Sequence, residues 1–375
     1  MGDDSLIEWL LGPDGRRGLT WNFVTGCDRL SEGCLGCYIE RQTPMRVAGR
    51  RFSGPQIGAT TGILLHPDRL DMPLRKRDPR RIFVNSMSDL WHDQVPDQMI
   101  AQAFAVMAMT PQHTYLILTK RPARMRAVLR SDGFWRAVGK YGQEITEARM
   151  LGKYRSASPM QLTDDDGSAD GYWMPVRPLP NVQIGVSVEN QKWADIRIPI
   201  LLDTPHIATR WISAEPLLGP INLDKVLYGD GPCPMGDPDC LGDEGDCHDA
   251  CERALDWVVA GGESGPKARP MHPDWARGLR DQCTAAGVPF FFKLHGEWMP
   301  IGPLYGDLEE TDEGHVEAVH LEVVEGKQVI QLESSGYIAE GHQPGDSRTW
   351  LMAKVGKHQA GAVLDGQTWT EYPDA

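Results

Sequence analysis

The feature that most limits the fold of this chain is a recurring unit, in which a short apolar run ends at polar residues and a stretch with helical spacing follows. Runs of this kind occupy residues 19–26, 81–89, 114–122, 181–190, 209–216, 255–265 and 288–293. Continuous apolar strands that alternate with helices indicate a parallel α/β sheet covered on both faces. Six or seven such units favour a full or partial (β/α) barrel over an open sheet.

The predicted barrel-type domain spans residues 1–295 and contains two insertions. Residues 139–180 are polar around "TDDDGSADG", and residues 229–253 are rich in Gly, Pro, Asp and Cys. Residues 296–375 carry "HVEAVHLEVV" and "KQVIQL", which resemble a hairpin. We therefore expect a small C-terminal subdomain that contains β-structure.

Polar side chains gather where the predicted strands end. Chemistry gathers at the carboxyl ends of strands in barrels and in open α/β sheets alike, so this pattern predicts a shared pocket. The alternative is that these residues are loop caps and turn residues. The residues concerned are Asn85, Ser86, Ser88, Asp89, Thr119, Lys120, Ser187, Glu189, Asn190, Ser213, Glu215, Gly261, Gly262, Glu263, Lys293 and His295.

The chain has 375 residues and a formal net charge of −14. That charge argues against nonspecific binding to nucleic acid or to an anionic membrane, but it leaves room for a local basic groove. One basic concentration exists: "LRKRDPRR" at residues 74–81 together with Lys120, Arg121, Arg124 and Arg126. It could follow a nucleic acid backbone, or it could be a solvated helix end and loop.

The N-terminus, "MGDDSLIEWLLGPDG", has acidic residues where a signal peptide has Lys or Arg. The longest apolar runs, such as "AFAVMAM" at residues 103–109, are too short to span a bilayer. We therefore expect a cytoplasmic protein with no membrane partner. In that reducing compartment, clustered cysteines are more often metal ligands or catalytic groups than disulfides.

Three cysteines lie in one loop after the first predicted strand. Six residues separate Cys27 from Cys34, and two separate Cys34 from Cys37. A structural zinc site needs four protein ligands, whereas three thiolates suit a 4Fe–4S cluster that keeps one open iron for a small molecule. Two alternatives remain: a zinc site completed by a distant Cys or Asp, and three unrelated buried thiols.

A second cysteine group lies within the predicted insertion at residues 229–253, with His248 beside it. Four thiols in a Gly- and Pro-rich loop without an apolar core suit a structural zinc site. An auxiliary iron–sulfur cluster and free surface thiols are the alternatives. The four residues are Cys233, Cys240, Cys247 and Cys251. The remaining cysteine, Cys283, is expected to be a small buried hydrophobe on a helix.

The three-cysteine loop after a first strand resembles the radical S-adenosylmethionine (SAM) superfamily. There a full or partial (β/α) barrel carries the cluster, and SAM chelates the open iron through its amino and carboxylate groups. This chain differs in having six residues rather than three between the first two cysteines, and Gly36 before the last one. "LILTKRPARM" and "IGVSVENQKWADIRIP" are similar to segments of the spore photoproduct lyase-like branch.

That resemblance implies roles for several strand-end residues. Lys120 would contact the SAM carboxylate, and Ser187 and Glu189 would lie near the ribose or sulfonium. Asn85, Ser86 and Asp89 would lie where the SAM amino group is held. The "GGE" of Gly261, Gly262 and Glu263 resembles the superfamily's amino-binding motif, although it could equally be a glycine turn that lets backbone approach a ligand. Glu215 completes the candidate cofactor-binding residues.

The chain as a whole resembles an uncharacterised phage and bacterial "three-Cys-motif" family. The shared marks are "WNFVTGC…GCxxCY", "FVNSMSDLWH", "LILTKRP", "GVSVENQ", "SAEPLLGPI", "GGESGPKARPM" and "VPFFFKLHGEW". These resemblances imply an enzyme that takes an electron from a reductase and cleaves SAM to a 5′-deoxyadenosyl radical. They suggest a nucleic acid base or a nucleotide as substrate. The alternatives are a non-catalytic zinc- or cluster-bearing nucleic-acid-binding or regulatory module, and a cluster enzyme that binds something other than SAM.

Overall fold

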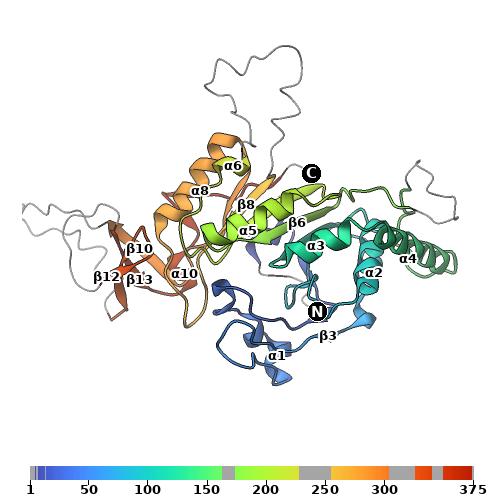
Figure 1. The fold of residues 1–375 in the computed structure, drawn as a ribbon, viewed down its shortest axis with the longest axis horizontal. Helices are drawn as coiled ribbons and strands as arrows, with labels where there is room; N and C mark the ends of the chain where they lie inside the picture. Colours follow the sequence, from blue (N-terminus) through green and yellow to red (C-terminus); the bar gives the residue numbers. More distant parts are fainter. Residues whose placement is uncertain are drawn as a thin grey trace, which may run out of the picture. The chain divides into compact units, whose positions relative to one another are not determined.

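The computed structural model describes residues 5, 7–12, 14–162, 174–227, 255–303, 326–339 and 349–373 (Figure 1). Its largest sheet has seven strands in the order β1-β4-β5-β6-β7-β8-β9, which is also their order along the chain. The pairs β1–β4, β4–β5, β5–β6 and β8–β9 are parallel. This is the arrangement of a partial (β/α) barrel, and it confirms the predicted fold class at that level. The strands are β1 (Leu19–Trp21), β4 (Arg81–Val84), β5 (Thr114–Thr119), β6 (Val182–Ser187), β7 (Thr209–Ala214), β8 (Trp257–Ala260) and β9 (Phe290–Phe292).

The chain divides into two compact units. The first comprises Met1–Ser187 and Ile196–Ile212, and the second comprises Val188–Asp195 and Ser213–Ala375. The division therefore falls inside the predicted domain of residues 1–295, and the C-terminal strands belong to the second unit.

In the first unit, three helices follow β4 and β5 along the chain, and Figure 1 shows them lying together. They are α2 (Asp97–Ala108), α3 (Pro122–Leu129) and α4 (Asp132–Met150). Phe104 of α2 contacts Phe134 and Trp135 of α4, with ring centroids 5.3 and 5.9 Å apart. The first part of the predicted insertion at residues 139–180 is therefore the second half of a packed helix.

Large aromatic side chains fill one face of the sheet in the first unit. Trp9 packs against Phe83 of β4 and Trp211 of β7, with ring centroids 4.8 and 5.4 Å apart. Gly185 of β6 makes room for Trp211, because a Cβ at that position would lie 2.5 Å from the indole ring. The glycine of the "VQIGVS" strand is thus required for packing and not for a turn.

In the second unit, α8 (Pro273–Ala286) ends at Gly287, which has φ 63° and serves as the predicted C-terminal cap. A four-stranded antiparallel sheet follows in the order β10-β13-β11-β12. "KQVIQL" lies largely in β11, but its predicted hairpin partner "HVEAVHLEVV" lies outside the described residues. The strands of this sheet are β10 (Trp298–Pro303), β11 (Val329–Glu333), β12 (Ile338–Ala339) and β13 (Thr349–Lys354).

A charged clasp ties the chain's C-terminal hairpin to α8. Arg277 and Arg280 of α8 both donate to the carboxylate of Asp365, at 2.6 and 2.5 Å. These hydrogen bonds hold the pKa of Asp365 at about 2, below its ordinary value of 3.8, against the opposing effect of its partial burial. The hairpin consists of β14 (Val363–Leu364) and β15 (Gln367–Thr368).

The remaining elements are short, apart from one helix. They are β2 (Val24–Thr25), β3 (Leu64–Leu65), α1 (Thr43–Val47), α5 (Gln191–Leu202), α6 (Asp224–Leu227), α10 (Lys357–Ala360) and the 3-10 turns Glu8–Leu10, Glu32–Cys34, Ile39–Arg41, Pro67–Arg69 and Pro73–Arg75. Within the described residues, the structure contains no helix of the length and apolar character that a bilayer crossing requires.

Candidate functional site

The cysteine loop is held on one side by a segment that the sequence patterns did not identify. β2 pairs antiparallel with β3. Just beyond β2, the backbone N–H of Cys27 donates to the Thr61 hydroxyl (2.9 Å), and the N–H of Thr61 donates to the Cys27 carbonyl (3.0 Å). This pairing fixes the backbone at the first cysteine.

On its other side, the loop is tied to the segment that follows β4. The side-chain amide of Asn22 donates to the Ser86 hydroxyl (3.1 Å), and its oxygen accepts from the N–H of Met87 (3.0 Å). The N–H of Gly26 donates to the Met87 carbonyl (2.8 Å). Ser86 and its neighbours, predicted as site residues, therefore do lie beside the cysteine loop.

Arg50 locks the loop where its two sides meet. Its guanidinium donates to the hydroxyl and the carbonyl of Thr25 (3.0 and 3.2 Å) and also to the carbonyl of Gly62. The backbones of Gly26 and Gly62 lie so close together that a Cβ on Gly26, which has φ 100°, would lie 1.7 Å from the Gly62 carbonyl oxygen. A glycine is therefore required immediately before Cys27.

The three cysteines of the loop are free thiols in one electrostatic environment. Burial raises the pKa of Cys27 to about 12, with smaller upward effects from Cys37 and Cys34 and a downward effect from Arg121. Burial also raises the pKa of Cys37 to about 11, and there the charge of Lys120 acts downward. The other two thiols thus act on the ionisation of Cys27, and Arg121 Nη1 lies 3.8 Å from its sulfur.

The two predicted kinds of metal site make different demands on the cysteine sulfurs. A tetrahedral zinc ion with Zn–S bonds of about 2.3 Å holds its sulfurs about 3.8 Å apart. In the part of the chain that the structure describes, no three His, Cys, Asp or Glu side chains are arranged to hold a single ion. A 4Fe–4S cluster binds each cysteine at a different iron, so its ligand sulfurs stand further apart. Three thiols with cations nearby supply the kind of ligand that a 4Fe–4S cluster requires.

Asp89 is the centre of a buried hydrogen-bond network at the ends of β4 and β5. Its carboxylate accepts from the Thr119 hydroxyl (2.8 and 2.9 Å) and from the backbone N–H groups of Lys120 (3.1 Å) and Trp91 (3.0 Å). The guanidinium of Arg121 adds a salt bridge at 3.2 Å. The carboxylate is therefore occupied in positioning the strand ends.

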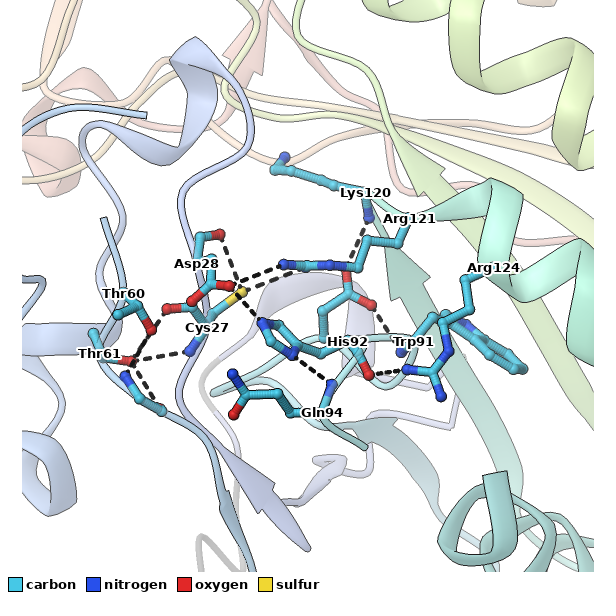
Figure 2. Close-up of polar contacts among 12 residues, drawn as sticks. Cys27, Asp28, Thr60, Thr61, Trp91, His92, Gln94, Lys120, Arg121 and Arg124 are labelled. Atoms are coloured by element: carbon cyan, nitrogen blue, oxygen red, sulfur yellow. Dashed lines mark hydrogen bonds and ion pairs between the residues drawn. The ribbon is translucent and has the colours of Figure 1, made fainter. Parts of the chain in front are cut away.

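A second carboxylate, Asp28, follows Cys27 directly (Figure 2). Its Oδ2 accepts from His92 Nε2 (2.8 Å) and lies 4.0 Å from the Arg121 guanidinium. His92 Nδ1 accepts from the N–H of Gln94 (3.1 Å), so the ring is the neutral tautomer that carries its proton on Nε2. Burial raises the pKa of Asp28, but hydrogen bonds from Thr60 and His92 outweigh it, and the pKa lies below its ordinary value.

The predicted basic concentration is separated by the fold. Residues 74–81 lead into β4, which begins at Arg81, whereas the basic residues from Lys120 onward follow β5. The two groups therefore lie at opposite ends of the parallel strands. Arg124 pairs with Asp97, and Arg126 pairs with Asp203. A continuous basic path through all of these residues is therefore absent from the described structure.

Asn85 presents a free donor beside the loop. Its backbone has φ 58°, an uncommon conformation for a residue other than glycine, and its Oδ1 accepts from the N–H of Val24 (3.1 Å). The amide Nδ2 is buried and has no hydrogen-bond partner among the described residues. A free N–H group suits a carboxylate, carbonyl or hydroxyl oxygen of a ligand, and not an amino group.

Ser187 and Glu189, two of the predicted site residues, are both buried. The backbone carbonyl of each accepts a hydrogen bond within its own unit. The Ser187 carbonyl accepts from the guanidinium of Arg197 (2.7 Å), and the Glu189 carbonyl accepts from the N–H of Leu218 (2.7 Å). Ser187 belongs to the first unit and Glu189 to the second. Their predicted contacts with a ribose or sulfonium stay predictions.

The acidic residues predicted in the second unit are ion-paired. Glu215, at the end of β7, accepts from Lys293 Nζ (2.6 Å). Glu263 is held by Arg269 through its backbone N–H (2.9 Å), Nε (2.8 Å) and Nη2 (2.7 Å). Each carboxylate therefore has a cationic partner from its own unit.

The glycines of "GGE" are needed for contact with backbone of the same unit. A Cβ on Gly262 would lie 2.1 Å from the His295 carbonyl oxygen, and one on Gly261 would lie 3.2 Å from the Lys293 Cβ. The chain after β8 therefore packs directly on the chain after β9. This packing accounts for Gly262 without a bound ligand and leaves little room for a side chain at Gly261.

Of the other five cysteines, only Cys283 lies within the described residues. The four of the second group lie outside the described residues, so their predicted zinc or cluster site stays a prediction. Cys283 is fully buried on α8, and burial raises its pKa to about 12, as expected for a structural thiol.

These observations define a class: an α/β protein with a partial-barrel parallel sheet, which carries a loop of three free cysteines at the carboxyl ends of β1, β4 and β5. Residues 5–373 match a family model described as "Protein of unknown function (DUF5131)", and the chain belongs to that family. No curated protein and no solved structure matches it.

Proposed function

We propose that the protein is a radical SAM-type enzyme, in which Cys27, Cys34 and Cys37 hold a 4Fe–4S cluster and SAM binds its open iron. The observation that carries this proposal is the gathering of three free thiols with the charges of Lys120 and Arg121 at the carboxyl ends of parallel strands. Cationic surroundings stabilise thiolate ligands, and a strand-end location is where barrel proteins place their chemistry.

The chain's own residues have distinct tasks in this proposal. Lys120, whose charge already acts on Cys37, is the cation for the SAM carboxylate. Asn85 contributes a buried N–H donor for a ligand oxygen, and Asp89 holds the strand ends in register. When bound, the cluster would supply one electron to SAM, whose reductive cleavage initiates hydrogen abstraction from the substrate.

The proposed partners follow from that chemistry. A low-potential electron carrier must reduce the cluster, and we expect the carrier and this protein to meet in the cytoplasm. A nucleic acid base or a nucleotide remains the proposed substrate, on the strength of the sequence resemblance alone. Because residues 74–81 lie away from the cysteine loop, a substrate backbone would not reach both basic groups at one end of the sheet.

The test is the metal content of protein that has been purified and reconstituted without oxygen. We expect about four irons and four sulfides per chain, and an EPR signal of the reduced protein that changes when SAM is added. Cys34→Ala should abolish the signal, whereas Cys283→Ala, which removes an equally buried thiol outside the loop, should retain it. Lys120→Ala should keep the cluster and weaken the SAM effect.

The opposite result is equally clear. Zinc without sulfide, together with no effect of SAM, would exclude the radical mechanism. The non-catalytic metal-bearing module would then be the better account of the cysteine loop.

A further inference from the structure

Arg121 makes a contact with the cysteine loop that neither the cysteine spacing nor the family resemblance identifies. Its Nη1 lies 3.8 Å from the Cys27 sulfur, within the range of an N–H···S hydrogen bond (Figure 2). The same nitrogen lies 3.2 Å from Asp89 Oδ2, and Nη2 lies 4.0 Å from Asp28 Oδ2. The side chain is only 10% exposed. One buried cation is thus shared between a ligand sulfur and two carboxylates.

The position of Arg121 is fixed by its backbone as well as by its side chain. It is the residue before the first turn of α3, and its N–H donates to the Thr119 hydroxyl (2.8 Å), which in turn donates to Asp89. A guanidinium carries several donors in a planar fork, so it can serve a sulfur and a carboxylate together. A lysine side chain is shorter, so its ammonium at this position would remain near Asp89 and stop short of the Cys27 sulfur.

We propose that Arg121 is a positioning residue that donates a hydrogen bond to the Cys27 sulfur and thereby raises the reduction potential of the cluster bound there. This inference rests on the proposed function. Reduction adds negative charge to a cluster, and hydrogen bonds to the ligand sulfurs stabilise that charge. Asp28 and Asp89 oppose the effect, so the potential depends on how the guanidinium divides its contacts among the three groups.

The test compares three variants of the full-length, cluster-loaded protein. Arg121→Lys keeps a charge beside Asp89 but loses the N–H···S contact, and Arg121→Met loses both. Arg126→Met is the matched control, because Arg126 lies within α3 and is also ion-paired, but its partner is the exposed Asp203. The measurement is the midpoint potential of the cluster, followed by EPR in a dye-mediated titration without oxygen.

We expect Arg121→Lys to shift the reduction equilibrium at least threefold against the reduced cluster, which is about 28 mV at 59 mV per tenfold change for one electron. Arg121→Met should shift it further in the same direction, and Arg126→Met should leave it unchanged. Loss of the Arg121 charge, acting through space, would lower the potential in Arg121→Met but not in Arg121→Lys, so the shift in Arg121→Lys reports the N–H···S contact itself.

Two results would overturn the inference while leaving the proposed function intact. In the first, the Arg121 variants hold a cluster whose potential equals that of the wild-type protein. In the second, both variants lose the cluster while Arg126→Met retains it, so that Arg121 acts in assembly and not in tuning. If the wild-type protein assembles no cluster at all, the proposed function itself fails, and this inference fails with it.

Discussion

The salt bridge between Asp89 and Arg121 allows a quantitative test of the electrostatics beside the cysteine loop. Both side chains are almost completely buried, at 7% and 10% exposure, and the charged atoms are 3.2 Å apart. Asp89→Asn keeps the size of the side chain but removes its charge. The buried guanidinium then lacks its main counter-ion, while one amide hydrogen faces the donors of Thr119 and Lys120.

Removing one partner of a buried pair costs about 3–5 kcal/mol, and we expect Asp89→Asn to lie near the lower end, because Asp28 remains 4.0 Å from Arg121. Arg121→Met should cost less, about 2 kcal/mol, since Asp89 keeps its hydrogen bonds from Thr119 and two backbone N–H groups. The double variant should be more stable than the sum of the two costs predicts, by about 2 kcal/mol.

The free energy of unfolding of the metal-free protein, from urea titration followed by tryptophan fluorescence, measures these differences. Asp203→Asn is the control, because its partners Arg126 and Arg130 lie at the surface, where an ion pair contributes about 0.2–1 kcal/mol. A cost below about 1 kcal/mol for Asp89→Asn, or strict additivity in the double variant, would show that the pair is not a buried unit.

Two further predictions concern the second unit. The pKa of Asp365 is about 2 in the folded protein against 3.8 ordinarily, so its contribution to the free energy of unfolding is present above about pH 4 and is lost as the pH falls toward 2. After allowance for its partial exposure, Asp365→Asn should cost about 1 kcal/mol at pH 7 and much less at pH 2.5, as measured by denaturant unfolding at both pH values. An equal cost at the two pH values would contradict the clasp with Arg277 and Arg280. Gly262→Ala places a methyl group 2.1 Å from the His295 carbonyl oxygen and should cost at least about 1–3 kcal/mol of unfolding free energy; an unchanged melting temperature would show that this backbone contact is not close.

The periodic strands of the parallel sheet could be predicted because burial on both faces leaves a continuous apolar run in the sequence. β5 and β6 lie within the predicted runs, with every residue of β6 buried. The end of the first strand was harder to predict. It is interrupted after Trp21, where Asn22 turns its side chain to the loop after β4. β3 left no pattern at all, since both of its two leucines are exposed.

The candidate site could be predicted only in part. The cysteine spacing marked the loop, and the polar ends of β4 and β5 marked Asp89 and Lys120. The partners of these groups could not be predicted, because a hydrogen-bonded pair such as Asp28 and His92 joins residues 64 positions apart, and no local pattern encodes it. Arg121 appeared in the sequence only as one of several basic residues, although its environment differs from that of its neighbours.

In the tripeptide Thr119-Lys120-Arg121, the position at which β5 ends determines which groups lie beside the cysteine loop. Three successive residues face three different groups, because the chain changes there from strand to helix. Thr119 and the backbone of Lys120 bind Asp89, the Lys120 charge acts on Cys37, and Arg121 reaches Cys27. A one-residue shift of the strand end would move every one of these groups, while the sheet itself would be unchanged. The positions of Lys120 and Arg121 beside the cysteines therefore depend on where β5 ends, and the hydrogen bonds of Asp89 to Thr119 and Lys120 hold that end in place.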